Sequence, residues 1–484
     1  MNSQVVPEDA VIVVFGGNGD LSKRKLLPAF WDLFQTGLMP QRWRLIGTSR
    51  SEMPDSDFVD LVRESIEEFG RGVSDDVAFS DFADHLRYRG GTFDAQDTGR
   101  VSDAVAEAEA EIGGEPLRLF YLSVPPVAFG TITEGLGACG LNERARVVFE
   151  KPFGTDPQSF AELDQTVHSV LEEEQIYRID HFLGKEALQN VLALRFANGM
   201  FEPVWNRQHI DHIQIDVPES IGIGTRAGFY EQTGAMRDMI VTHLFQVLSV
   251  IALEPPVSLE PKPLMDEKAK VFESMALLQP QDVVYGQYES YTKAEGVDKD
   301  SQTETFAAAK VEIDNWRWAG VPIYLRTGKQ MAEKRQTVTL AFNRPPRQMF
   351  ADRGLKEDGQ DHLTLDMSGD PGFSISFLAK KPGPRLELQE ASMRFSYEQS
   401  FFSGPDANEA SRLEAYERLL HDALMGDRTL FTRADGIGRT WDLVKPILDS
   451  PPKVHRYPDG SWGPPEATEL IAPRRWHLPE DHDH

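Results

Sequence analysis

A short apolar run, a glycine-rich turn and an amphipathic segment near the N-terminus constrain the fold most. Residues 11–15 read VIVVF, a β-branched run that stops at Gly16 and is typical of a buried parallel strand. Further glycines follow, and apolar residues then repeat at helical spacing until Gly37, a suitable C-terminal stop. Strand, glycine turn and helix in this order are typical of a dinucleotide-binding unit. Because the complete G-x-G-x-x-G pattern is missing, a plain tight turn is the alternative.

The second predicted strand, residues 44–49, ends in Arg50. An acid at that position would bind the ribose 2′-hydroxyl of NAD, whereas arginine suits the 2′-phosphate of NADP. The spacing from the glycines is longer than usual, so a merely solvated Arg50 stays open. Further strands at 117–124 and 147–149 and a helix at 160–174 complete a Rossmann-like domain, for which we predict residues 1–180.

Strand signals change character in the second half of the chain. Four segments alternate apolar and polar residues, as in a sheet with one covered face: 213–217, 321–325, 337–342 and 373–377. We therefore predict that residues 181–484 form an α+β domain with a large, mainly antiparallel sheet.

Two segments gather residues that carry chemistry. Asp180, His181 and Lys185 precede a predicted helix that begins near Lys185, and a helix N-terminus with two cationic side chains favours a phosphate. The alternative is that Asp180 caps the helix and both cations are only solvated. In the helix predicted at 236–251, His243 interrupts an apolar face, either as a satisfied core residue or as a buried general base that an acid must orient.

Charge and composition exclude several kinds of partner. The net charge of −27 argues against nucleic acid and anionic membranes. Apolar runs stay well below membrane-spanning length, and the single cysteine, Cys139, fits a reducing compartment. We expect a cytoplasmic protein.

Several of these segments together resemble one family. The string RIDHFLGKE at 178–186 is similar to the signature of glucose-6-phosphate dehydrogenases, with Phe182 where that family has tyrosine. GGNGDLSKRK at 16–25, EKPFG at 150–154, the segment 218–246 and LRTGK at 325–329 resemble further family motifs in the same order. The segment 218–246 departs from the family at Val241 and Thr242, which stand for a glutamine and an asparagine.

The resemblance implies oxidation of C1 of glucose 6-phosphate to 6-phosphogluconolactone with NADP, or possibly NAD, the first step of the oxidative pentose phosphate pathway. It makes His243 the base, oriented by Asp180. It assigns the substrate to His181, Lys185, Lys151, Glu219, Asp238, Lys329, Lys334 and Lys25. It assigns the cofactor to Gly16, Asn18, Gly19, Asp20, Leu21, Arg50 and Lys151. No metal is required, and a homodimer or homotetramer is expected.

Two alternatives stay open beside this resemblance. One is a related dehydrogenase that acts on an unphosphorylated sugar and has no need for His181 and Lys185. The other is a catalytically silent NADP-binding regulatory protein, which needs no base.

Overall fold

The computed structural model describes residues 6–478, except 348, 351–359, 369–370 and 403–412. The chain divides into two compact units. The first comprises Met1–Gly184, Val257–Met265 and Asn408–Gly438. The second comprises Lys185–Pro256, Asp266–Ala407 and Arg439–His484. The first unit thus takes in two segments from far along the chain, for which the sequence offers no local signal.

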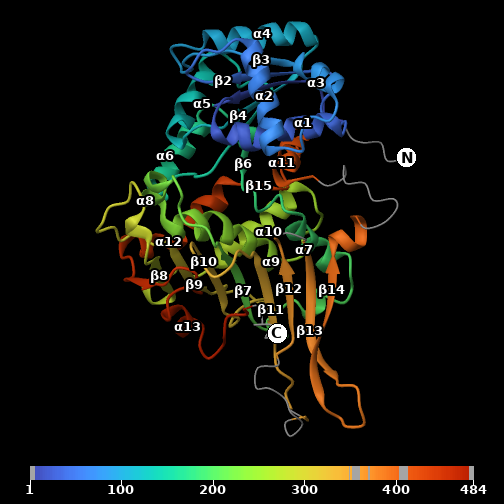
Figure 1. The fold of residues 1–484 in the computed structure, drawn as a ribbon, viewed down its shortest axis with the longest axis vertical. Coiled ribbons are helices and arrows are strands. Elements are labelled where there is room, and N and C mark those ends of the chain that lie inside the picture. Colours follow the sequence, from blue (N-terminus) through green and yellow to red (C-terminus); the bar gives the residue numbers. More distant parts are fainter. Residues whose placement is uncertain (1–5, 348, 351–359, 369–370, 403–412, 479–484) are drawn as a thin grey trace. The chain divides into compact units, whose positions relative to one another are not determined.

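The first unit is built on a seven-stranded sheet (Figure 1). Its strands are β1 (Ala10–Phe15), β2 (Trp43–Thr48), β3 (Leu86–Tyr88), β4 (Leu117–Leu122), β5 (Ala145–Phe149), β6 (Ile176–Ile179) and β15 (Phe431–Thr432). The first six are parallel in the order β3-β2-β1-β4-β5-β6, and β15 adds antiparallel to β6. This is the strand order of a Rossmann fold, so the predicted fold of the N-terminal region is confirmed.

Helices accompany these strands along the chain. They are η1 (Ser22–Leu26), α1 (Leu27–Gln35), α2 (Asp55–Phe69), α3 (Asp76–Ala83), α4 (Gly99–Ile112), η2 (Pro126–Ala128), α5 (Phe129–Ala138), α6 (Pro157–His168), η3 (Glu173–Gln175) and α11 (Ala415–Met425). The helix predicted at 160–174 is α6, which starts at the Asp156 cap, where the carboxylate accepts the N–H of Ser159, and ends at His168. Strands β3 and β6 were not predicted. Both are very short, and such strands depend on pairing with a neighbouring strand, which periodicity does not reveal.

The second unit contains a nine-stranded sheet. Its strands are β7 (Ile210–Pro218), β8 (Val283–Tyr288), β9 (Phe306–Val311), β10 (Ile323–Gly328), β11 (Thr337–Phe342), β12 (His362–Asp366), β13 (Gly372–Lys380), β14 (Leu388–Ser396) and β16 (Val454–Tyr457). The order is β14-β13-β12-β11-β7-β10-β9-β8-β16, in which the β7–β10 and β8–β16 pairs are parallel and the other pairs antiparallel. The predicted, mainly antiparallel sheet is confirmed.

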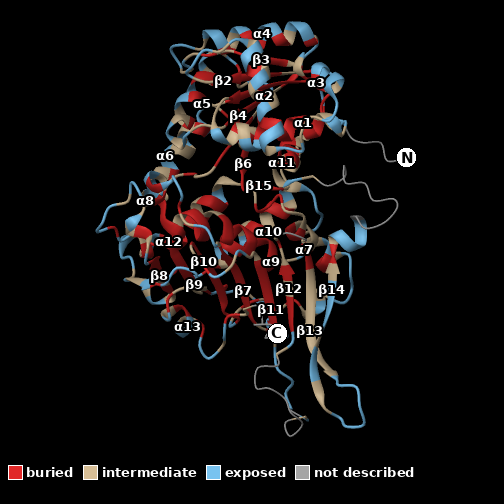
Figure 2. Cartoon of the chain, viewed as in Figure 1, coloured by how far each residue is buried: buried red, intermediate tan, exposed pale blue. Residues whose placement is uncertain are grey.

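Helices connect the strands of this unit along the chain. They are α7 (Glu186–Phe196), η4 (Glu202–Val204), α8 (Ala227–Ala235), η5 (Met236–Leu244), α9 (Phe245–Ala252), η6 (Pro280–Asp282), η7 (Tyr291–Lys293), η8 (Glu398–Phe402) and α13 (Glu466–Ile471). Helices α10 (Pro261–Ser274) and α12 (Ala434–Asp449) each begin in one unit and continue into the other. Figure 2 shows the central strands and α9 buried, whereas β14 is largely exposed.

Helices α8, η5 and α9 follow one another from Ala227 to Ala252, with a break at Gly234, where φ is 62°. In the described residues this is the one helical stretch long and apolar enough to cross a membrane, and 89% of its most apolar window is buried inside the protein. A core helix of a soluble protein meets the same criteria.

Candidate functional site

The glycine turn after β1 has a backbone that only glycine allows. Gly16 has φ 77°, and a Cβ atom there would lie 2.0 Å from the carbonyl oxygen of Ser123. The N–H of Gly16 donates to the carbonyl of Thr48 at 2.8 Å, and that of Gly19 to the carbonyl of Gly16 at 2.8 Å. A helix begins directly afterwards at Asp20. Because its first N–H groups lack partners within the helix, the turn fits the pyrophosphate of a dinucleotide.

The predicted cofactor residues beyond the glycines lie around this turn. Asn18 Nδ2 donates to Ser51 Oγ at 3.0 Å, which ties the turn to the segment after β2. Arg50 is exposed on that segment. The nearby acid Glu52 forms an ion pair with Arg100.

Other predicted residues stand on the first turns of the helix. Asp20 forms an ion pair with Arg24 at 2.8 Å, and Leu21 is half-buried. Lys25 is exposed, and its Nζ lies 3.7 Å from the carboxylate of Glu414. Lys25 is thus held at the glycine end of its helix by a residue that arrives from the C-terminal third of the chain.

The turn after β5 carries Lys151, which is half-buried and joined to Pro152 by a cis peptide bond. Its neighbour Glu150 accepts a hydrogen bond from the Tyr121 hydroxyl at 2.5 Å and another from Tyr416. Burial raises the pKa of Glu150 and of both phenols. No local sequence pattern indicates this group, because Tyr121 reads as one more apolar strand residue and Tyr416 lies far along the chain.

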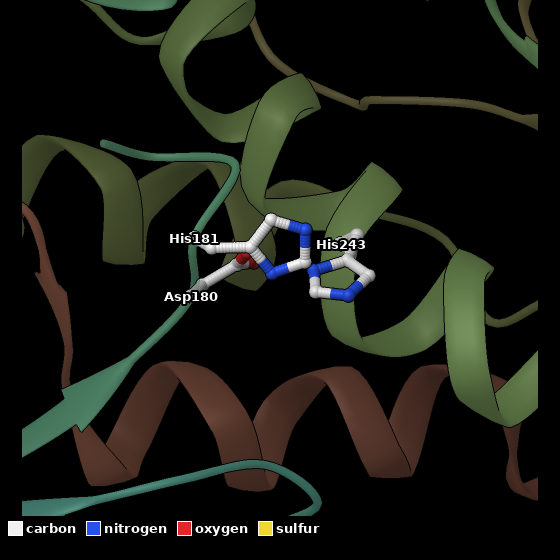
Figure 3. Close-up of side chains that lie close together, drawn as sticks. All are labelled: Asp180, His181 and His243. Atoms are coloured by element: carbon white, nitrogen blue, oxygen red, sulfur yellow. The ribbon is translucent and has the colours of Figure 1, made fainter. Parts of the chain in front are cut away.

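Asp180 and His181 follow directly after β6, and Figure 3 shows both on that segment and His243 on a helix. Asp180 Oδ1 accepts the N–H of Phe182 at 2.9 Å. The ring of His181 lies parallel to that of Tyr416, with 6.4 Å between centroids. Phe182 is buried, with its ring centroid 5.0 Å from that of His181. The imidazole therefore has two aromatic rings as neighbours.

Helix α7 begins directly after Lys185, as predicted, in the second unit. Lys185 Nζ donates to the side chain of Gln336 and, at 3.4 Å, to the carbonyl of Met367. Lys334 is exposed on the segment just before β11. Gln336 was missed, since a lone glutamine before a strand carries no local signal.

Glu219 and Lys329 stand one residue beyond the ends of two neighbouring strands. In the parallel β7–β10 pair, Gly328 lies opposite Pro218, so the next residue of each strand meets its counterpart. Lys329 Nζ lies 2.6 Å from Glu219 Oε2, and also 5.3 Å from the ring centroid of Tyr230. The structure thus brings together a predicted donor and a predicted acceptor for sugar hydroxyls.

Helix η5 carries the proposed base. His243 is 1% exposed and Asp238, on the same helix, is 8% exposed. The hydroxyl of Thr242 donates to the backbone carbonyl of Asp238 at 2.5 Å. That hydroxyl is therefore used by the helix itself, as is common for threonine within helices. Val241, the second departure from the family pattern, is buried.

Comparisons with known proteins cover both units. Residues 13–190 match the model of the glucose-6-phosphate dehydrogenase NAD binding domain, and residues 192–477 match that of the C-terminal domain of the same enzymes. The chain is 39% identical to glucose-6-phosphate 1-dehydrogenase of Aggregatibacter actinomycetemcomitans, over 98% of either chain. It is 39% identical to that of Mycolicibacterium smegmatis, over 99% of either chain.

Solved structures give the same result. The crystal structure of glucose-6-phosphate 1-dehydrogenase from Mycobacterium avium superposes with a TM-score of 0.86 at 38% identity, over 98% of this chain and 99% of that one. A glucose-6-phosphate dehydrogenase in complex with glucose 6-phosphate superposes with a TM-score of 0.90 at 32% identity, over 99% of this chain and all of the other. With matches to both domain models and to relatives of the same length, this chain belongs to the glucose-6-phosphate dehydrogenase family.

Proposed function

We propose that this enzyme oxidises glucose 6-phosphate at C1 to 6-phosphogluconolactone, with His243 as general base and NADP as the preferred hydride acceptor. The observation that carries the proposal is the imidazole of His243, which is 1% exposed on a helix whose other buried residues, apart from Asp238, are apolar. A buried imidazole in a family that must remove a hydroxyl proton has the chemistry of a base. The comparisons give no support to a dehydrogenase for unphosphorylated sugars or to a silent regulatory protein.

The proton step needs a base and a group that orients it. His243 takes the proton of the C1 hydroxyl as the C–H bond breaks. The carboxylate of Asp180 accepts the N–H at the other side of the ring, which fixes the tautomer of His243 and stabilises the imidazolium. The proton leaves the C1 hydroxyl oxygen for His243, the hydride leaves C1 for the nicotinamide, and the C1–O bond becomes the lactone carbonyl; neither transfer requires a Lewis acid.

The phosphate and the sugar are held by separate groups. His181 and Lys185 bind the 6-phosphate, and exposed Lys334 adds charge. Because Gln336 already holds Lys185 at the start of α7, the ammonium is oriented before substrate arrives. Sugar hydroxyls are contacted by Lys25, Lys151, Glu219, Asp238 and Lys329.

The cofactor is held by residues in and near the glycine turn and by Lys151 on the turn after β5; the former are Gly16, Asn18, Gly19, Asp20, Leu21 and Arg50. When bound, the nicotinamide supplies the acceptor for the hydride. Arg50 binds the 2′-phosphate of NADP. The position that would bind the ribose 2′-hydroxyl of NAD lacks a carboxylate, since Arg50 is flanked by Ser49 and Ser51.

The experiment compares the wild type with His243→Asn, supplying NADP or NAD and either glucose 6-phosphate or glucose. We expect activity that requires the phosphate, favours NADP and falls by a factor of about 10² to 10⁴ in the variant. Full activity in the variant would show that His243 is not the base. Equal rates with glucose and glucose 6-phosphate would show that His181 and Lys185 do not form a phosphate site.

Localisation and assembly complete the proposal. We place the enzyme in the cytoplasm, as a homodimer or homotetramer that has neither nucleic acid nor membrane as partner. Sedimentation velocity and cell fractionation test these points.

A further inference from the structure

Glu304, a residue outside every predicted site, caps the helix that carries the proposed base. It lies just before β9 and is 8% exposed. Its Oε1 accepts the N–H of Met236 at 3.1 Å, and its backbone carbonyl accepts the N–H of Ala235 at 3.0 Å. These N–H groups stand where α8 ends and η5 begins. The first N–H groups of a helix have no partners within it, so Glu304 supplies them from a distant segment.

Gly234 makes the space that the carboxylate occupies. Its φ is 62°, and a Cβ atom there would lie 2.2 Å from Oε1 of Glu304. No side chain at 234 could therefore coexist with the carboxylate in this position. Glycine at 234 thus allows both the positive φ of the helix break and the close approach of the buried acid.

The residue after Glu304 anchors a second part of the proposed site. The carbonyl of Thr305 accepts the N–H of Lys329 at 2.9 Å. The hydroxyl of Tyr457 contacts the Thr305 hydroxyl at 3.1 Å and donates to the carbonyl of Lys329 at 2.6 Å. Two consecutive residues thus join the start of η5 to the strand end that presents Lys329.

Burying the carboxyl group of Glu304 as a helix cap costs free energy. Burial raises the pKa of Glu304 to about 7, and the positive charge of Arg237 partly opposes this increase. Burial raises the pKa of Tyr230, Tyr285 and Tyr291, and the negative charge of Glu304 adds to each of these increases. A serine or asparagine could cap a helix without burying a charge, but neither reaches across from another segment as glutamate does.

We propose that Glu304 is a positioning residue for catalysis, which fixes the start of η5 so that Asp238 and His243 are held in register with Lys329. This inference rests on the roles proposed above for His243 and Asp238. The effect is on the geometry of the base, since small displacements of a catalytic group lower the rate of the chemical step.

The test uses Glu304→Ala, Glu304→Gln and the control Glu231→Gln. Glu231 is a neighbouring acid on α8, and its carboxylate accepts from Tyr291 at 2.5 Å and Ser301 at 2.8 Å. We expect Glu304→Ala to lower kcat by about ten- to a hundredfold with a smaller change in the KM for glucose 6-phosphate. Glu304→Gln keeps an acceptor oxygen, so its kcat should fall less than that of Glu304→Ala. The control should retain wild-type kcat.

Hydrogen exchange distinguishes positioning from general destabilisation. In Glu304→Ala, a peptide covering residues 235–244 should exchange faster, while one covering α7 keeps wild-type protection and the Kd of NADP is unchanged. Wild-type kcat with unchanged exchange at 235–244 would overturn the inference. Faster exchange throughout the second unit would also overturn it, because the residue would then be structural only.

The same experiment separates this inference from the proposed function. If His243→Asn remains active, the proposed base is wrong and Glu304 has no base to position. If His243→Asn is inactive and Glu304→Ala is normal, only the inference about Glu304 fails.

Discussion

The buried ion pair between Asp216 and Arg326 is the sharpest test of how the second unit is held together. Asp216 on β7 and Arg326 on β10 are register partners in the parallel pair, and they are 3% and 1% exposed. Their contact is bidentate, with Nε–Oδ1 at 2.8 Å and Nη2–Oδ2 at 2.6 Å. The guanidinium also lies over the ring of Trp476 at 4.4 Å. Asp216 and Arg326 lie three residues before Glu219 and Lys329 respectively, so the pair fixes the strands that present them.

The perturbation is Asp216→Asn, which leaves a buried guanidinium without its counter-charge. Breaking one partner of a buried pair costs about 3–5 kcal/mol. Arg335, whose Nε lies 3.8 Å from Asp216, adds to the uncompensated charge. At about 2–4 °C per kcal/mol for a domain of this size, the Tm should fall by about 6–20 °C.

The assay is urea and thermal unfolding followed by tryptophan fluorescence, since Trp462 and Trp476 both lie over Arg326. The control is Asp449→Asn, which breaks the exposed Lys445–Asp449 pair and should cost less than about 0.5 kcal/mol. The double variant Asp216→Leu with Arg326→Met should recover at least half of the loss, because both charges of the pair itself are removed and only Arg335 loses a more distant partner. A loss below about 1 kcal/mol for Asp216→Asn alone would refute the reasoning.

Three further predictions concern the phosphate site, the cofactor and pH. Phe182→Tyr should lower the KM for glucose 6-phosphate about fivefold, the equivalent of one hydrogen bond of about 1 kcal/mol, and an unchanged KM would contradict a phosphate near this ring. Arg50→Ala should raise the KM for NADP and leave that for NAD nearly unchanged; equal effects on both would point to stacking on adenine. Burial raises the pKa of Asp32 and brings that of Glu417 from 4.5 to about 7. Because the folded state then binds more protons than the unfolded one, stability should fall as pH rises from about 4.5 to 7, and Glu417→Gln should flatten this dependence in urea titrations at several pH values.

The carboxyl pair behind the pH prediction joins segments that are far apart in sequence. Asp32 lies on α1 and Glu417 on α11, and Arg71 lies 3.7 Å from the first carboxylate and 3.3 Å from the second. The same helix α11 supplies Tyr416 to Glu150 and to the ring of His181. Protonation of the pair therefore bears on how firmly α11 is held against the cofactor-binding unit.

Local sequence patterns predict much of the secondary structure of this enzyme. The glycines at 16, 17 and 19, the helix beginning at Lys185 and the apolar stripe around His243 depend on residues within one or two turns of each other, so periodicity and turn chemistry predict them. The alternating strands of the second half predicted the class of its sheet for the same reason. Motif resemblance then indicated the family and the candidate residues. The matches to both domain models confirm the family.

Tertiary structure alone decided the partners of those residues. Nothing near Phe431 in the sequence indicates that it pairs with Ile179, or that α11 returns to the N-terminal unit. The contacts of Lys185 with Gln336 and of Met236 with Glu304 likewise join residues separated by 151 and 68 positions. Hydrophobic periodicity records which face of an element is buried, but the same buried face can be covered by many segments. Which segment covers it is settled only when strands pair and side chains pack, and that choice supplies the caps and counter-charges of the site.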